Sequence, residues 1–143
     1  MIRLQFQLCE RGAIQMNFLS KYNDHTYAAL RIVSGAIFTF HGVQKIFGFL
    51  AEYQPAVGSQ LWIGGMIELI CGVLIVIGFQ TRWAAFLSSG TMAVAYIQYH
   101  WSFSFGPEFF PAINGGDAAI LYSLVFLHIA CHGGGKWALD RVE

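Results

Sequence analysis

Hydrophobic residues are grouped along the chain into four nearly continuous stretches, residues 28–49, 61–79, 84–100 and 118–132, separated by polar connections. A helix needs about 20 apolar residues to cross about 30 Å of hydrocarbon, and each stretch approaches that length, the fourth being the shortest. Residues 69–77 are apolar all round, whereas a helix of a soluble bundle keeps a polar outer face. The pattern therefore predicts an all-α fold, an integral membrane four-helix bundle, and disfavours a soluble helical bundle.

The same pattern divides the chain into two parts. Residues 26–143 form the predicted four-span domain, and residues 1–25 form a cytoplasmic or interfacial N-terminal tail. The tail has two early arginines but no continuous apolar run before Thr26, so it does not have the pattern of a cleaved signal peptide. A short interfacial helix and a mobile tail both fit its composition.

Positive charges set the expected orientation in the membrane. The chain has eight Lys and Arg residues, and only Lys45 falls on one side of the predicted spans. The other seven fall on the opposite side: Arg3, Arg11, Lys21, Arg31, Arg82, Lys136 and Arg141. Because cytoplasmic segments carry the excess of positive charge, both termini and the turn at 80–82 are expected in the cytoplasm. The tryptophans support these boundaries, because all four mark span ends: Trp62, Trp83, Trp101 and Trp137.

Composition excludes several kinds of function. The formal net charge is zero and no basic stripe is present, which argues against a nucleic-acid partner. Cys9, Cys71 and Cys131 are far apart, which disfavours a thiol-disulfide enzyme or a thiolate metal site. His128 and His132 lie one helical turn apart and could bind a metal or haem, but no further ligand is clustered with them. We predict neither a metal site nor catalytic residues.

Ionisable residues within the first two stretches mark the expected site. Such groups cost a few kcal/mol each inside a bilayer, so their positions are informative. Counted along the helices, His41 lies about 20 Å from the cytoplasmic end, Lys45 lies about 6 Å further, and Glu68 returns to nearly the height of His41. His41 and Lys45 share a helix face at spacing four. A buried Glu68 would be stabilised by either of them.

The third and fourth stretches extend this polar layer. Tyr96 and His100 are expected at about 20 and 25 Å, on a stripe that begins at Ser89. Asp117 is expected to cap the fourth helix at the outer surface. The alternative is that the layer only joins the helices through hydrogen bonds.

The connection 102–116 is rich in phenylalanine and is interrupted by Pro107 and Pro111, which oppose a continuous helix. It either folds inward as a lid over a lipid-soluble ligand or lies as an aromatic belt at the membrane surface. The sequence does not choose between these two arrangements.

Several motifs carry a family resemblance over about residues 27–141. They are ALR at 29–31, FHGVQKIFG at 40–48, Gly65 with Glu68 and Gly72, GFQTR at 78–82, FPAINGGD at 110–117, Leu121-Tyr122 and WALDR at 137–141. The chain thereby resembles the DoxX family of small four-span bacterial membrane proteins, which often have Glu at the position of Asp117. The resemblance implies a quinone-facing membrane partner of an oxidoreductase. The candidate ligand-binding residues are His41, Gln44, Lys45, Glu68, Tyr96, His100, Asn114 and Asp117.

The leading hypothesis is a membrane anchor or quinone-coupling subunit of an oxidoreductase, in which the polar layer holds a quinone head group. The chain has no cysteine pair and no recognisable flavin or dinucleotide motif, so it is not expected to complete a redox cycle alone. Its expected partners are the lipid bilayer, a quinone, an oxidoreductase subunit and a second copy of itself. The alternatives are a small-molecule or proton-coupled transporter acting as an oligomer, a non-catalytic membrane scaffold and, less favoured, a haem protein.

Overall fold

The computed structural model describes residues 17–101, 103 and 105–140, and these residues form helices and connections without any strand. The helices are α2 (Asn17–Ser20), α3 (Asn23–Phe47), α4 (Gln60–Ile77), α5 (Thr81–Ala95), a π-helix η1 (Tyr96–Trp101), a 3₁₀-helix η2 (Pro107–Phe109), α6 (Pro111–Asn114) and α7 (Asp117–His132). The predicted all-α class is confirmed for this part of the chain. The interpretation of the tail falls largely on residues 1–16, which lie outside the described residues.

Each of the four predicted stretches overlaps one long helix, but α3 begins at Asn23, inside the predicted tail, and α5 begins at Thr81. The helix α4 begins after Ser59, whose Oγ accepts a hydrogen bond from the Trp62 N–H at 3.2 Å. It ends at Gly78, which takes the left-handed conformation with φ 70°. The third stretch was predicted as one helix over 84–100, but α5 gives way to the π-helix after Ala95.

The predicted cap of the last helix was wrong by one residue. Gly116 is the N-cap of α7, and Asp117 is the first residue of the helix. The Oδ1 atom of Asn114 accepts a hydrogen bond from the Gly116 N–H at 2.8 Å, so the amide of Asn114 organises this turn.

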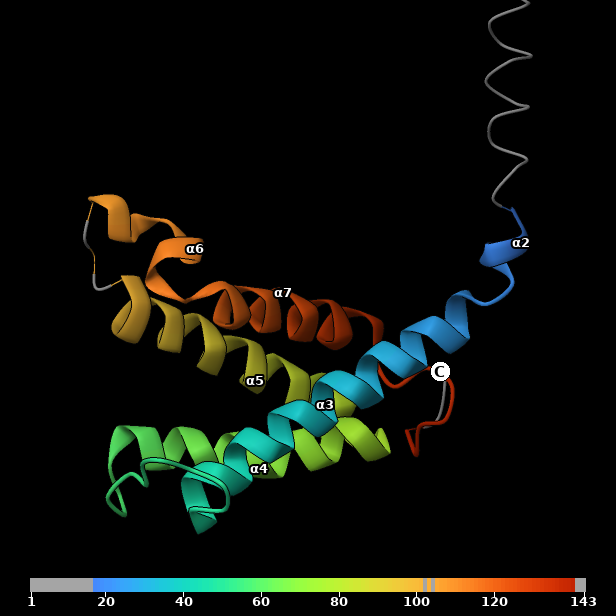
Figure 1. Cartoon of the computed structure of the whole chain (residues 1–143). Helices are drawn as coiled ribbons and strands as arrows, with labels where there is room; N and C mark the ends of the chain where they lie inside the picture. Colours follow the sequence, from blue (N-terminus) through green and yellow to red (C-terminus); the bar gives the residue numbers. More distant parts are fainter. Residues whose placement is uncertain (1–16, 102, 104, 141–143) are drawn as a thin grey trace, which may run out of the picture.

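The long helices pack as two pairs, α3 against α4 and α5 against α7, and contacts between α4 and α5 join the pairs (Figure 1). Glycines bring α3 and α4 together. A Cβ on Gly42 would lie 2.7 Å from the Leu69 Cα and 2.8 Å from the Gly65 oxygen, and a Cβ on Gly35 would lie 3.1 Å from the Gly72 oxygen. Because these neighbours are backbone atoms, only glycine allows this separation of the two helices.

The end of the bundle that holds the C-terminus in Figure 1 is closed by a buried arginine. Arg31 is fully buried, and its guanidinium donates to the carbonyl oxygens of Ile75 and Val76 in α4 and of Lys136 and Trp137 after α7. A planar guanidinium can satisfy several acceptors at once, which a lysine could not do with the same geometry. Arg31 therefore joins three segments of the chain.

Asp140 completes this closure from the C-terminal segment. Its carboxylate accepts hydrogen bonds from the backbone N–H groups of Gln80 and Thr81 at the start of α5, each at 2.8 Å. Burial raises the pKa of this carboxyl group, but the contacts with Thr81 and Gln80 and the charge of Arg31 together lower it below its usual value. The folded state thus favours the ionised carboxylate.

One of the described helices, α4, is long and apolar enough by itself to cross a membrane, with 18 residues and a mean hydropathy of 2.1. The other apolar helix, α7, is shorter, with 16 residues. The π-helix shortens the α-helical part of the third stretch to 15 residues.

Candidate functional site

The site is built around an ion pair between α3 and α4. The Lys45 Nζ atom donates to Glu68 Oε1 at 2.5 Å, and the Glu68 side chain is only 5% exposed whereas that of Lys45 is 32% exposed. The sequence left open whether Lys45 or His41 would partner Glu68, and the structure selects Lys45.

The geometry of antiparallel helices explains this pairing. Lys45 lies level with Gly65, so Glu68 stands three residues, or about 4.5 Å, further along α4. Every Cα–Cβ bond tilts toward the N-terminus of its own helix, so the two side chains lean toward each other. Gly65 makes room for the lysine stem, because a Cβ there would lie 2.7 Å from the Lys45 Cβ.

The second oxygen of the Glu68 carboxylate has no such partner. Glu68 Oε2 is buried and accepts no hydrogen bond from the residues that the structure describes. An ionised carboxylate normally accepts several hydrogen bonds, and a buried acceptor without one costs about 1–3 kcal/mol. The site thus holds a carboxylate oxygen whose capacity to accept hydrogen bonds is left unused by the described residues.

A cavity of about 390 Å³ lies beside this carboxylate, between α4 and α5, and we call it the α4–α5 cavity. Lys45 and Glu68 supply its charge, and most of its wall is apolar. The remaining lining residues are Gln60, Leu61, Ile63, Gly64, Ile67, Phe86, Leu87, Gly90, Thr91, Val94, Ala95 and Tyr99. Such a wall with a few converging polar groups suits a small, largely apolar ligand.

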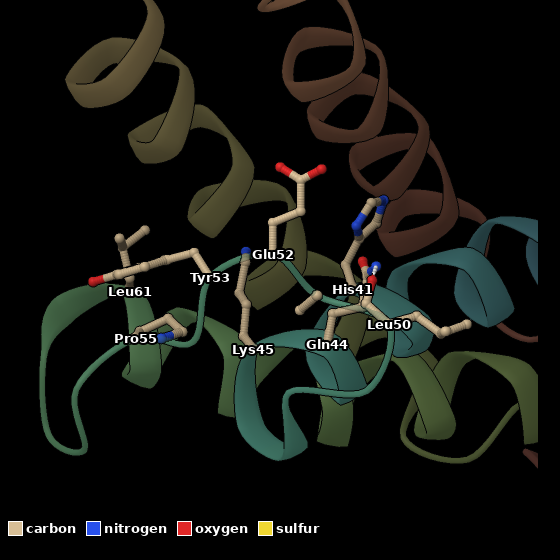
Figure 2. Close-up of a pocket in the computed structure, with 9 residues that line it drawn as sticks. His41, Gln44, Lys45, Leu50, Glu52, Tyr53, Pro55 and Leu61 are labelled. Atoms are coloured by element: carbon tan, nitrogen blue, oxygen red, sulfur yellow. Dashed lines mark hydrogen bonds between the residues drawn. The ribbon is translucent and has the colours of Figure 1, made fainter.

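A second hollow, of about 550 Å³, lies on the other side of Lys45, under the connection between α3 and α4. We call it the loop-side hollow. Figure 2 shows the side chains of His41, Lys45 and Glu52 extending toward the same side of this hollow. Gln44 also lines it, and its side-chain amide donates to the Leu50 oxygen at 3.2 Å. Lys45 and Leu61 line both spaces, so the ion pair lies where the hollow and the cavity meet.

The other candidate residues lie apart from these two spaces. The Tyr96 and His100 rings stack with centroids 6.3 Å apart, and His100 Nδ1 lies 3.1 Å from the Asn114 oxygen. The Asn114 side chain donates to the Glu108 oxygen at 2.8 Å, and Asp117 is exposed. These four residues line neither the α4–α5 cavity nor the loop-side hollow. These two spaces therefore do not bring the candidate residues of all four helices into one site, and the binding roles of these four residues stay predictions.

The wrong choice of helix face explains this difference. The predicted stripe on the third stretch began at Ser89, but the Ser89 hydroxyl donates to the Ser123 oxygen of α7 at 2.8 Å. The face of α5 that lines the α4–α5 cavity carries Leu87, Thr91 and Ala95, and Tyr99 continues it. Residues two positions apart in an α-helix, such as Ser89 and Thr91, lie on nearly opposite faces.

Sequence reasoning missed five polar lining residues, namely Gln60, Thr91 and Tyr99 in the α4–α5 cavity and Glu52 and Tyr53 in the loop-side hollow. Spacing could have found two of them, because Gln60 precedes Glu68 by two steps of four residues and Tyr99 follows Thr91 in the same way. No comparable signal marks Glu52, because it lies in an irregular connection whose path depends on tertiary contacts.

The phenylalanines of the connection 102–116 do not cover the site. Phe105 and Phe109 pack against Trp101, with ring centroids 5.7 and 5.8 Å away, and both are exposed. Neither of them, nor Phe103 or Phe110, lines the cavity or the hollow. Between the two arrangements considered above, this geometry favours an aromatic belt over a lid.

Comparison with known proteins adds the family. The sequence model of the DoxX family matches residues 26–101, more than half of the chain. The chain belongs to the DoxX family. An uncharacterized protein of Haemophilus influenzae is 42% identical to this DoxX protein over 130 residues, which cover 88% of the chain and 96% of that relative. No solved structure matches this chain.

Family membership confirms the resemblance seen in the sequence motifs, and it makes this chain a DoxX-family membrane protein. It assigns no ligand to the Lys45–Glu68 pair. The chemistry of the site must therefore be argued from the residues themselves.

Proposed function

We propose that this DoxX protein crosses a bacterial inner membrane four times, as a helical bundle with both termini in the cytoplasm. The support comes from the outer faces of the helices, which expose large apolar side chains. Those that line neither the cavity nor the hollow include Val33, Ile37 and Phe40 on α3, Ile70, Val73 and Ile77 on α4, Trp83 on α5, and Leu121, Leu124 and Leu127 on α7. Apolar surface on every long helix would be costly in water but is the normal outer surface of a protein in lipid.

The interior supports the same proposal. The polar and charged residues Arg31, Ser34, Glu68, Thr81, Ser88 and Ser89 are buried. Intramembrane ionisable groups face the bundle interior and pair with each other or with backbone carbonyls, which describes both Glu68 with Lys45 and the carbonyl contacts of Arg31. The side of the membrane assigned to each end follows from the excess of Lys and Arg near the termini.

Within this bundle, the α4–α5 cavity is proposed to bind the head group of a membrane quinone. The observation that carries the proposal is the half-paired carboxylate of Glu68 in an apolar cavity. A quinol hydroxyl would donate to Glu68 Oε2, and a quinone carbonyl would accept from the Lys45 ammonium, which has three N–H donors. One ion pair thus offers an acceptor to the reduced ring and a donor to the oxidised ring.

In this proposal the protein is the membrane anchor and quinone-coupling subunit of an oxidoreductase. The chain supplies the binding site and the attachment to the membrane, and a partner subunit supplies the redox centre that exchanges electrons with the bound ring. The walls of the α4–α5 cavity are mostly apolar, so a lipid-soluble quinone can enter it from the bilayer.

The test is equilibrium binding of reduced menaquinone and ubiquinone analogues to the purified protein in lipid nanodiscs. Hydrogen bonds to charged groups contribute about 1.5–3 kcal/mol, so Glu68→Gln should weaken binding of the quinol about 10- to 100-fold. Glu108→Gln, which changes a carboxylate outside both cavities, is the matched control and should bind as the wild type does. Equal binding by the wild type and Glu68→Gln would refute the assignment.

One further observation favours a second candidate, a proton-coupled transporter acting as an oligomer. Lys45 lines both the α4–α5 cavity and the loop-side hollow, where His41 and Glu52 could exchange protons with it. Flux of a small solute into proteoliposomes that depends on a proton gradient and is lost in Glu68→Gln would support this candidate over the quinone site.

A further inference from the structure

The end of the α4–α5 cavity away from Glu68 has polar groups of its own. The Tyr99 hydroxyl donates to Gln60 Oε1 at 3.5 Å, and Gln60 Nε2 donates to Gln98 Oε1. Gln60 and Tyr99 both line the cavity. The phenol oxygen of Tyr99 keeps lone pairs that can accept a further hydrogen bond.

The two polar ends of the cavity lie along one face of α4. Gln60, Gly64 and Glu68 follow each other at spacing four, and Gln60 stands about 12 Å from Glu68 along the helix axis. The Glu68 side chain leans toward Gln60, because Cα–Cβ bonds tilt toward the helix N-terminus. The two polar ends are thereby close enough for one small molecule to span them.

The wall between the two polar ends is open. A Cβ built on Gly64 would meet no atom within 4 Å, and the same is true of Gly90 on α5, which also lines the cavity. These glycines differ from Gly42 and Gly65, whose missing side chains are required by close helix contacts. Helix packing therefore does not explain Gly64 and Gly90, whereas a flat ring against the helix backbones would use the space they leave.

We propose that the α4–α5 cavity selects an aromatic ring with oxygen substituents at opposite ends. The ring lies over Gly64. It donates one hydroxyl to Glu68 and the other to the Tyr99 oxygen beside Gln60. Tyr99 is then a specificity-determining residue. The inference rests on the proposed function, because both use the acceptor at Glu68. It goes further by naming the second contact and the ring position.

The experiment compares two probes of one ring system, 1,4-dihydroxynaphthalene and 1-naphthol, kept reduced under nitrogen. Their dissociation constants are measured by equilibrium dialysis with the full chain in nanodiscs. A single net hydrogen bond predicts about three- to tenfold tighter binding of the dihydroxy compound by the wild type. Tyr99→Phe should abolish this preference while leaving the affinity for 1-naphthol unchanged.

Two further variants keep the test decisive. Gln60→Leu, which removes the amide that holds Tyr99, should also reduce the preference. Gly64→Leu should abolish binding of both probes without lowering the unfolding temperature, because its side chain would enter open space. The second contact is overturned if Tyr99→Phe keeps the wild-type preference or weakens binding of both probes equally. The ring position is overturned if Gly64→Leu binds both probes as the wild type does.

Failure of the proposed function has a different signature. If the wild type binds neither probe, or if Glu68→Gln binds both as well as the wild type does, the quinone site itself is refuted together with this inference. If Glu68→Gln weakens both probes but Tyr99→Phe changes nothing, the site stands and only the contact at Tyr99 is refuted.

Discussion

The unequal burial of the two partners predicts an unequal cost of breaking the Lys45–Glu68 ion pair. Removing one partner of a buried pair costs about 3–5 kcal/mol, because the other charge stays buried. Lys45→Met leaves the carboxylate of Glu68, whose side chain is 5% exposed, and should reduce the free energy of unfolding by about 3 kcal/mol. Glu68→Gln leaves a lysine that is 32% exposed and can extend its ammonium toward solvent, so we expect a cost of about 1 kcal/mol.

The double variant Lys45→Met/Glu68→Leu removes both charges and should recover most of the loss, since apolar replacement of a buried pair is often neutral. The assay is unfolding in mixed micelles with increasing SDS, followed by circular dichroism, for the wild type and the three variants. If Glu68→Gln is as destabilising as Lys45→Met, or if the double variant is no more stable than Lys45→Met, the reasoning from burial is refuted.

Three more outcomes follow from the packing and the closed end, each measured as a free energy of unfolding in micelles. Gly42→Ala should cost about 1–3 kcal/mol because its methyl group meets backbone of α4, whereas Gly64→Ala, with open space, should be neutral or up to about 1 kcal/mol stabilising. Arg31→Met should lower the free energy of unfolding by at least about 3 kcal/mol, because it leaves buried carbonyls without a donor. Arg82 is exposed, so Arg82→Met should lower it by about 1 kcal/mol or less. The lowered pKa of Asp140 contributes stability that is complete above about pH 4 and is lost as the pH falls through the folded value, so Asp140→Asn should flatten the acid limb of the stability profile.

The hydrophobic pattern was sufficient to predict the long helices, because each apolar stretch is bounded by residues that end helices. Ser59 and Gly78 act locally, through a side-chain cap and a left-handed conformation. The change to a π-helix at Tyr96 could not be predicted in this way. It has no single-residue signal, and it joins α5 to a connection whose course depends on contacts such as that of His100 with Asn114.

For the site, sequence reasoning identified the charged pair but not the surfaces around it. Lys45 and Glu68 were identifiable because few ionisable residues occur within the apolar stretches. Which face of α5 meets α4 was not identifiable, since Ser89 and Thr91 are both small and polar and lie on opposite sides of that helix. Only the observed bond from Ser89 to α7 shows which of them faces the cavity. Tyr96 shares the face of Ser89 at a spacing of seven residues, whereas Tyr99 shares the face of Thr91 at a spacing of eight, so choosing the face of Ser89 selected Tyr96.

The contacts of Arg31 have a consequence for synthesis of the chain. Two of its acceptors are the carbonyls of residues 136 and 137, and Asp140 fixes the same segment to the start of α5. The guanidinium emerges from the ribosome more than a hundred residues before these acceptors do. The contacts of Arg31 in α3 are therefore incomplete until translation is nearly over. Chains released early, without the last eight or so residues, would keep the acceptors of Arg31 in α4 but would leave its Nη2 group without the two carbonyls that it binds in the complete fold.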